Sequence, residues 1–549
     1  MNRYCYFILF LIILSKIKTT TYRCGTNDLK LNPYNIEPTK EEKERRRRLS
    51  SSYQPISIKV DFTPFSRPSG MTSQTFNRIK DIIEETLNEF KKFLLIQHVS
   101  IDLSNYLNRI KESCDVDEVS ADYSNFLKND DVVIFPSFYK IADNVLAAAK
   151  FCLTESKRPI AGSLYINPNL SFDIVNSDIY MKNLLLHEIS HILVFHPILF
   201  DQLNMLTRKN SAYYITSTKA LLKARQHFNC PTLSGIPLEN QGGEGSAGSH
   251  WETQYMLGDY MISTDYSDFV LSDITLALFE DSGFYKVNYY SGGLFKFGKN
   301  KGCDFLNKKC IDNGILLSEE EFCNVPRYPI CSGSKTFKGV CGIYDYSVTD
   351  EVIPPEYQYF DNPNYGGYLA ANFCPVSAIQ DSETNYFPDS CKVGTSTLHS
   401  DFGEKMGDNS FCFVSSLLPT STTLNDTEPQ TICYKVQCDS SKKQIIVSVG
   451  SQNVICPTLG GEIIPSQFKG SIICPKYYDI CDFKDNVMCN DLYDCLTKKV
   501  EPDPESYDFE PDDEDFIRIT KNRMEGKFIQ INYFIYLSLV IYMIQYFIY

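Results

Sequence analysis

The chain has 549 residues, of which 43% are hydrophobic and 22% are charged, so it is long enough for two to four globular domains. Its formal net charge is −15. A chain this acidic is not expected to bind nucleic acid, nor to be attracted by charge to an anionic membrane surface.

The N-terminus, "MNRYCYFILFLIILSK", places an arginine before a short apolar run. This pattern is typical of a secretory signal peptide, which we assign to residues 1–20. Export makes the nineteen cysteines after Cys5 candidates for disulfides, and because nineteen is odd, at least one should have another role. Glycosylation motifs at Asn169 and Asn425 are compatible with the secretory pathway.

A polar segment follows and ends in "EEKERRRR". We predict a short pro-segment at residues 21–48, with Arg45–Arg48 as a processing site for a protease that recognises basic residues. The alternative is a solvated run of charges.

The next block alternates between strand and helix patterns. Strands are predicted at residues 56–62, 130–138 and 162–168, and a helix at residues 73–94 with Ser73 as its cap. A further apolar helix begins at Ser177 or Asp178 and is expected to stop at Pro197. This mixture predicts an α+β lobe over residues 49–200.

The last of these helices contains "HEISH", with His187, Glu188 and His191. Two histidines four residues apart lie on one helical face and can bind the same Zn²⁺ ion. The glutamate beside them can accept a proton from the water that zinc activates. A catalytic zinc site also needs a third protein ligand.

Two common sources of that third ligand do not fit this sequence. No glutamate occurs between Glu188 and Glu239, so a glutamate ligand about twenty residues after the motif is missing. In the compact pattern H-E-x-x-H-x-x-G-x-x-H, Val194 occupies the glycine position and His196 is one residue out of place. A different zinc hydrolase that uses His196 or Asp201 is an alternative interpretation.

Two more histidines are candidates for the third ligand. His227 occurs in "ARQHFNC", and His250 follows the glycine-rich stretch "NQGGEGSAGS". Glycines allow the chain to fold back sharply before His250. Met261 follows eleven residues later and can form the methionine turn of the metzincin class.

The C-terminal part has a different composition. Fifteen cysteines fall between Cys303 and Cys495 without any C-x-x-C pair, which favours disulfides over zinc-binding cysteines. We predict a central domain at residues 201–307, a cysteine-rich and mainly β C-terminal domain at 308–500, and an acidic linker at 501–527. The apolar residues 528–549 are long enough to anchor the protein in a membrane, as a terminal helix or as a removable lipid-anchor signal.

Several segments together resemble the leishmanolysin family of surface metalloproteases. They include "HEISH", "GSAGSHW", "DYMIS", "FGKNKGCDFLNKKC" and "YFDNPNYGGYLAANFCP", and the resemblance extends over about residues 50–495. It implies a metzincin-like catalytic lobe with an inserted central domain. It also implies one Zn²⁺ bound by His187, His191 and His250, with Glu188 as the catalytic residue and Met261 in the methionine turn. Val194 departs from the family, which usually has glycine where the chain turns.

The resemblance also suggests a role for Cys24, in "YRCGTNDLK". Family members carry a pro-segment cysteine that occupies the open zinc position until the segment is removed, and a thiolate is a strong zinc ligand. Without Cys5 and Cys24, eighteen cysteines remain for nine disulfides.

The predicted function is a zinc endopeptidase that cleaves protein or peptide substrates at the cell surface or outside the cell. The alternative is a zinc-containing adhesion protein of the same fold with weak catalysis. Val194 favours that alternative, whereas Glu188 argues against it.

Overall fold

The computed structural model describes residues 24–40, 52–120, 130–142, 145–169, 178–210, 212–240, 247–264, 268–289, 295–349, 351–378, 390–392, 402–421, 428–439 and 441–481. The predicted signal peptide, arginine run, Asn425 motif, acidic linker and apolar anchor lie outside these residues.

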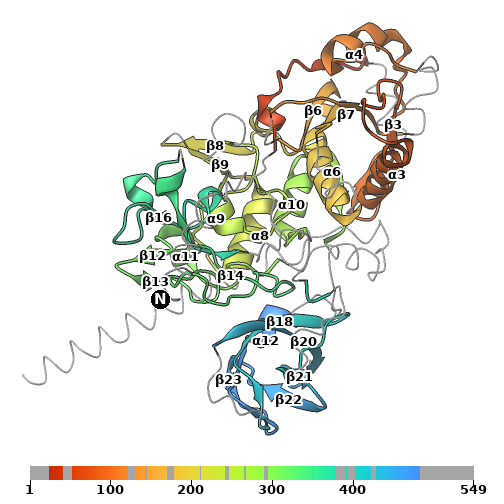
Figure 1. The fold of residues 1–549 in the computed structure, drawn as a ribbon. Helices are drawn as coiled ribbons and strands as arrows, with labels where there is room; N and C mark the ends of the chain where they lie inside the picture. Colours follow the sequence, from red (N-terminus) through yellow and green to blue (C-terminus); the bar gives the residue numbers. More distant parts are fainter. Residues whose placement is uncertain are drawn as a thin grey trace, which may run out of the picture. The chain divides into compact units, whose positions relative to one another are not determined.

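A five-stranded sheet, whose strands β3, β6 and β7 are labelled in Figure 1, forms the centre of the N-terminal lobe. Its strand order is β1-β6-β7-β5-β3. Its strands are β1 (Tyr34–Ile36), β6 (Ala147–Glu155), β7 (Arg158–Ile166), β5 (Val132–Phe138) and β3 (Ile58–Val60). Strands β6 and β7 form an antiparallel hairpin, whereas the other neighbours are parallel. The strand expected at 130–138 is confirmed, the one expected at 162–168 is found at Arg158–Ile166, and the one expected at 56–62 is shorter than predicted.

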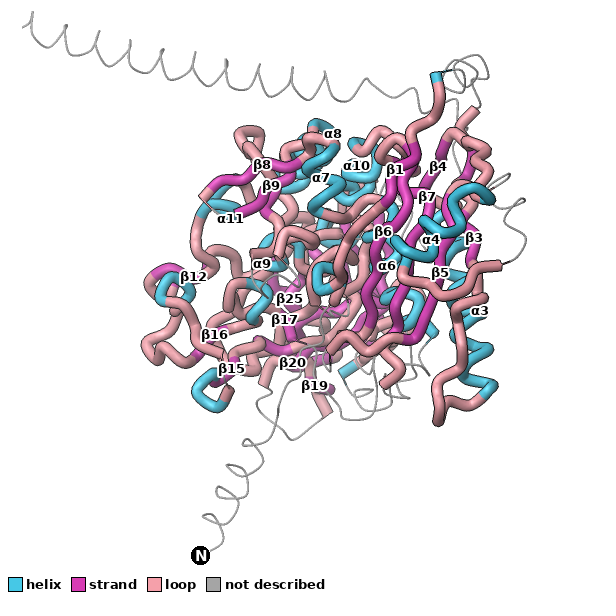
Figure 2. The backbone as a smooth tube through the Cα atoms, turned by 90° about the horizontal axis from the view of Figure 1, so that it is seen from above, coloured by secondary structure: helices cyan, strands magenta, loops and turns pink. Residues whose placement is uncertain are grey.

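Helices cover both faces of this sheet. Helices α3 (Ser73–Phe90) and α6 (Asp178–Leu193) pack on one face, and α4 (Leu107–Cys114) crosses the other (Figure 2). Along β5, Val132 and Ile134 join the core of the first face, while Val133 and Phe135 join the core around α4. This alternation follows from the two-residue period of a strand, and it makes the sheet apolar on both sides.

Two helix boundaries differ from the prediction. Helix α3 is capped by Thr72 and not by Ser73, because the Thr72 hydroxyl accepts a hydrogen bond from the backbone N–H of Thr75. Helix α6 ends at Leu193, before Pro197, and this proline instead starts the short helix α7 (Pro197–Gln202). Proline is well tolerated there, since the first residue of a helix has no intrahelical use for its N–H.

Helix α6 lies unusually close to strand β7. A side chain at Gly162 would place its Cβ 2.4 Å from Cγ2 of Ile192, so only glycine leaves room for the helix. Residues 178–202 are the one described helical stretch that is long and apolar enough to cross a membrane, and most of it is buried in this core.

The central segment returns to the N-terminal lobe through a second small sheet. Strand β11 pairs with β4, which in turn pairs with β2. The elements of this part are β2 (Gln54–Pro55), β4 (Leu94–Ile96), β8 (Leu206–Lys209), β9 (Ala212–Ile215), α8 (Thr218–Phe228), β10 (Ile236–Pro237), α9 (Thr253–Met256), α10 (Asp273–Asp281), β11 (Tyr285–Val287) and α11 (Cys303–Asn307).

Short strands and a six-stranded antiparallel sheet make up the cysteine-rich part, so the predicted α+β class is confirmed. The sheet has the order β22-β21-β20-β18-β25-β23. Its strands are β18 (Ser410–Ser415), β20 (Gln430–Asp439), β21 (Gln444–Val449), β22 (Gln452–Cys456), β23 (Gly461–Ile463) and β25 (Ile472–Cys474), followed by α12 (Tyr477–Ile480). The short pairs before and beside it are β12 (Ile311–Asp312) with β13 (Ile315–Leu316), β14 (Val340–Cys341) with β17 (Ser377–Ala378), β15 (Tyr344–Asp345) with β16 (Tyr365–Gly366), and β19 (Leu418–Pro419) with β24 (Phe468–Lys469).

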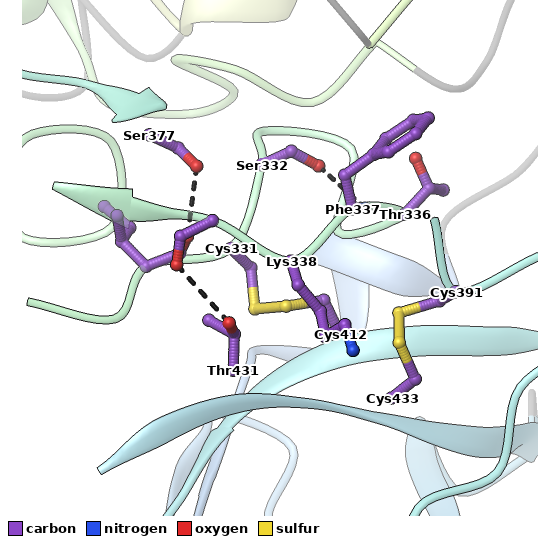
Figure 3. Close-up of a disulfide and its surroundings, with 12 residues drawn as sticks. Cys331, Ser332, Thr336, Phe337, Lys338, Ser377, Cys391, Cys412, Thr431 and Cys433 are labelled. Atoms are coloured by element: carbon purple, nitrogen blue, oxygen red, sulfur yellow. Dashed lines mark hydrogen bonds between the residues drawn. A yellow bond between two sulfur atoms is a disulfide. The ribbon is translucent and has the colours of Figure 1, made fainter. Parts of the chain in front are cut away.

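Eight disulfides hold the described chain together. They are Cys114–Cys152, Cys230–Cys303, Cys310–Cys374, Cys323–Cys341, Cys331–Cys412, Cys391–Cys433, Cys438–Cys481 and Cys456–Cys474. Figure 3 shows two of them, which join the loop before β14 and the segment at Cys391 to strands β18 and β20. The predicted use of the cysteines in disulfides is thus confirmed for sixteen of them, while Cys489 and Cys495 lie outside the described residues.

Candidate metal centre

The two histidines of "HEISH" are held by backbone carbonyls. The Nδ1 atom of His187 lies 2.6 Å from the carbonyl oxygen of Tyr260, and Nδ1 of His191 lies 2.6 Å from that of Phe195. Because a carbonyl can only accept, each Nδ1 carries the proton, and each Nε2 presents a lone pair. The two Nε2 atoms are 3.0 Å apart, so both lone pairs are directed to the same place.

The third histidine comes from the central segment. The Nε2 of His250 lies 3.3 Å from Nε2 of His187, and the ring is completely buried. Burial lowers the pKa of His187 to about 4. Burial also lowers the pKa of His191, and repulsion from the neighbouring histidines adds to this effect. The rings of His187 and His191 are therefore neutral at pH 7, which is the state that binds a metal ion.

Cys24 brings a fourth donor to the same point. Its sulfur lies 3.4 Å from Nε2 of His191, and the four donor atoms lie within 4.8 Å of one another. A tetrahedral zinc ion separates two nitrogen ligands by about 3.3 Å and a nitrogen from a sulfur by about 3.6 Å. The observed spacing and the donor set, three imidazoles and one thiol, therefore fit a zinc ion.

Glu188 is completely buried beside this cluster. One carboxylate oxygen accepts a hydrogen bond from the hydroxyl of Thr26 at 3.2 Å and lies 3.6 Å from the sulfur of Cys24. The other oxygen, Oε1, is buried and has no hydrogen-bonding partner among the residues that the structure describes. Burial raises the pKa of Glu188 to about 8, against the opposing effect of these two hydrogen bonds.

The segment around Cys24 is held against strand β6. The N–H of Gly25 donates to the carbonyl of Ala147 at 3.2 Å, and the Thr26 hydroxyl accepts from the N–H of Ala149 at 3.2 Å. Ten residues later, β1 pairs with the other end of β6. Thr26 was not predicted from the sequence. Its position two residues after Cys24 could have suggested it, but its contact with Glu188 depends on the fold.

Met261 lies in a buried turn of the central segment. Its carbonyl accepts a hydrogen bond from the N–H of Trp251, the residue after His250, at 3.0 Å. The preceding carbonyl, of Tyr260, is the one that holds His187. The structure therefore joins the predicted methionine turn to two of the three histidines.

The other candidate ligands lie outside the cluster. His196 caps α7 through its Nδ1, which accepts from the N–H of Ile198 at 3.2 Å, and its ring packs edge-on against Phe151. His227 contacts the carbonyl of Phe297 at 2.8 Å, and Asp201 is exposed. Val194 is buried in the core and does not adopt a positive φ, so the chain turns after α6 without the conformation that would require glycine.

Comparisons with known proteins identify the family. Leishmanolysin of Leishmania donovani is 29% identical over 374 residues, which cover 65% of this chain and 61% of that protein. Leishmanolysin of Leishmania major is 28% identical over 372 residues, covering 64% and 60%. A leishmanolysin-like peptidase of Drosophila melanogaster is 28% identical over 305 residues, covering 49% and 44%.

This chain thus spans about three fifths of the length of the Leishmania proteins. The sequence model of the family described as Leishmanolysin matches residues 79–488, about three quarters of the 549 residues. On this match, together with the motifs and the His–Cys cluster, the chain belongs to the leishmanolysin family.

Proposed function

We propose that this protein is a zinc endopeptidase in its latent form. The observation that carries the proposal is the convergence of three buried imidazoles on one point, with the carboxylate of Glu188 beside them. His187, His191 and His250 would hold the ion. Zinc bound there would polarise the carbonyl of the peptide bond to be cleaved and lower the pKa of a water molecule in its fourth position.

The remaining chemistry belongs to Glu188. Once the pro-segment has left, its carboxylate is free of Thr26 and Cys24 and can accept the proton of the attacking water. It can then donate that proton to the nitrogen of the leaving amine. In the latent form burial raises the pKa of Glu188, and a general base works best when its pKa lies near the working pH.

The pro-segment blocks both partners of this reaction. Cys24 would occupy the fourth zinc position. The Thr26 hydroxyl donates a hydrogen bond to the oxygen of Glu188 that would otherwise contact water. We therefore propose that residues 21–48 keep the enzyme latent until they are cleaved and released. Two observations support this proposal. Gly25 and Thr26 are hydrogen-bonded to β6, and β1 pairs with the same strand, so the segment is attached to β6 at both places.

The disulfides support action outside the cell, where such bonds persist. The substrates we propose are proteins or peptides, which enter beside Glu188. Attachment to a membrane by residues 528–549, as a helix or through a lipid anchor, belongs to the same proposal and rests on their composition.

Zinc content in ligand variants tests the site. All proteins carry Cys24→Ala, because the thiol could otherwise replace a lost histidine. We expect one zinc ion per chain in this parent and in His196→Ala and His227→Ala, but a loss of zinc in His250→Ala. Full zinc content in the His250→Ala protein would show that the third ligand is a different residue.

A further inference from the structure

The peptide group between Tyr260 and Met261 is hydrogen-bonded at both ends. Its carbonyl oxygen accepts the Nδ1–H of His187 at 2.6 Å. Its N–H, on Met261, donates to a carboxylate oxygen of Asp259 at 2.8 Å. A single rigid peptide plane therefore connects the carboxylate of Asp259 to the imidazole of His187.

The second carboxylate oxygen of Asp259 leads to the other side of the cluster. It accepts hydrogen bonds from the Thr275 hydroxyl at 2.8 Å and from the N–H of Ser272 at 3.3 Å. The oxygen of Thr275 in turn accepts the indole N–H of Trp251 at 2.7 Å. Trp251 directly follows His250, so this second arm reaches the histidine contributed by the central segment.

Asp259 has no exposed surface. Two backbone N–H groups and one hydroxyl donate hydrogen bonds to its carboxylate, as suits an ionised group. Burial raises its pKa to about 6, so the group is negatively charged at pH 7. A charged acceptor at the N–H end polarises the peptide group and strengthens its carbonyl as an acceptor. A stronger acceptor on Nδ1 makes Nε2 of the same ring a better metal ligand.

We propose that Asp259 is a positioning residue for the metal ligands. It acts on His187 through the Tyr260–Met261 peptide and on His250 through Thr275 and Trp251. This inference rests on the proposed zinc site and adds to it a buried charge, distant in sequence from "HEISH", that tunes the affinity for zinc.

A simpler role is that Asp259 only stabilises the turn, since its contact with the N–H two residues ahead is a common turn motif. Asp268 provides a matched control for this role. It is also buried, and its carboxylate accepts from the N–H of Ser334 at 2.8 Å and from the Thr336 hydroxyl at 3.2 Å. These partners belong to the cysteine-rich part and not to the histidine cluster.

The experiment compares the full chain with its Asp259→Asn and Asp268→Asn variants, each freed of metal and then titrated with zinc against a competing chelator. The melting temperature of each metal-free protein is measured in parallel. We expect Asp259→Asn to bind zinc about 10- to 100-fold more weakly. Asp268→Asn should keep the affinity of the parent, and the two variants should lose similar metal-free stability.

Equal zinc affinity in Asp259→Asn and the parent would overturn the proposal. So would a weakened affinity accompanied by a much larger loss of metal-free stability than in Asp268→Asn, because that is the result of a structural role alone. If Asp259→Asn does not fold, Thr275→Val tests the arm to Trp251, and unchanged affinity there would refute that arm. A parent that binds no zinc would instead reject the proposed function itself.

Discussion

Replacing Gly25 with alanine should activate the latent protein without touching a residue of the mature site. The backbone of Gly25 has φ −108° and ψ 13°, which alanine can adopt. The effect of the substitution must therefore come from steric contact of the added methyl group. An added Cβ would lie 2.6 Å from Cγ1 of Val145 and 3.4 Å from Cβ of Ala148. Either Val145 or the pro-segment must shift to relieve the first contact, and a shift of the pro-segment would weaken the hydrogen bond from the N–H of Gly25 to the carbonyl of Ala147.

Overpacking of this kind costs about 1–3 kcal/mol, which multiplies the open fraction of the latent protein by about 5- to 150-fold. The assay is hydrolysis of a denatured protein by the secreted chain with its arginine run intact. Its activity is expressed relative to the same protein after processing and removal of the pro-segment. The processed forms of parent and variant should be equally active, which provides the control. Unchanged latency in a Gly25→Ala protein with normal folding would refute the account of the pro-segment.

Three further predictions concern stability. Gly162→Ala should destabilise the protein by about 1–3 kcal/mol in denaturant unfolding, because its Cβ would meet Ile192 at 2.4 Å. Adding Ile192→Val should recover part of that loss. An unchanged stability of Gly162→Ala would contradict the close packing of α6 on β7. Replacing Cys114 and Cys152 with alanine removes the disulfide that closes a loop of 38 residues, and it should lower the free energy of unfolding by about 4 kcal/mol. The denaturation midpoint should fall accordingly, and an unchanged midpoint would argue against this disulfide. Burial lowers the pKa of His196 to about 4, so the unfolded chain binds this proton more readily, and stability is lost as the pH falls from about 6.5 towards 4. Between pH 7 and pH 5 the free energy of unfolding of the parent should fall by about 2 kcal/mol more than that of His196→Asn. Asparagine still offers a cap for α7, so the comparison isolates the titration of the ring. Equal losses in the two proteins would contradict a buried neutral ring.

Much of the candidate metal centre could be predicted from the sequence because its first half is local. The spacing of His187 and His191 places both side chains on one helical face, whatever surrounds the helix. His250 is different, since residues alone left it in competition with His196 and His227, and the resemblance to the leishmanolysin family favoured it. The structure brings His250 to the cluster and leaves the other two elsewhere.

The residues that were missed are those whose role depends on distant contacts. Thr26 and Glu188 are 162 positions apart, and no periodicity connects them. Asp259 occurs in an unremarkable turn until the fold places its neighbour's carbonyl against His187. Strand β6 was missed for a physical reason as well, because all nine of its residues are buried and its sequence lacks the alternation of a half-buried strand.

The choice of Thr72 over Ser73 as the cap of α3 reflects another limit. Both side chains can cap a helix, and only the backbone geometry at the first turn selects between them. The consequence is a shift of one residue that changes nothing in the packing of the helix.

The central claim, that this is a zinc endopeptidase with Glu188 as its catalytic residue, is tested most directly by proteolysis. The secreted protein, processed at the arginine run, is incubated with a denatured protein substrate beside its Glu188→Ala counterpart. We predict cleavage by the parent, loss of cleavage with a zinc chelator, and none by Glu188→Ala at equal zinc content. Equal, negligible activity in both proteins with zinc still bound would contradict the claim and favour a zinc-containing binding protein.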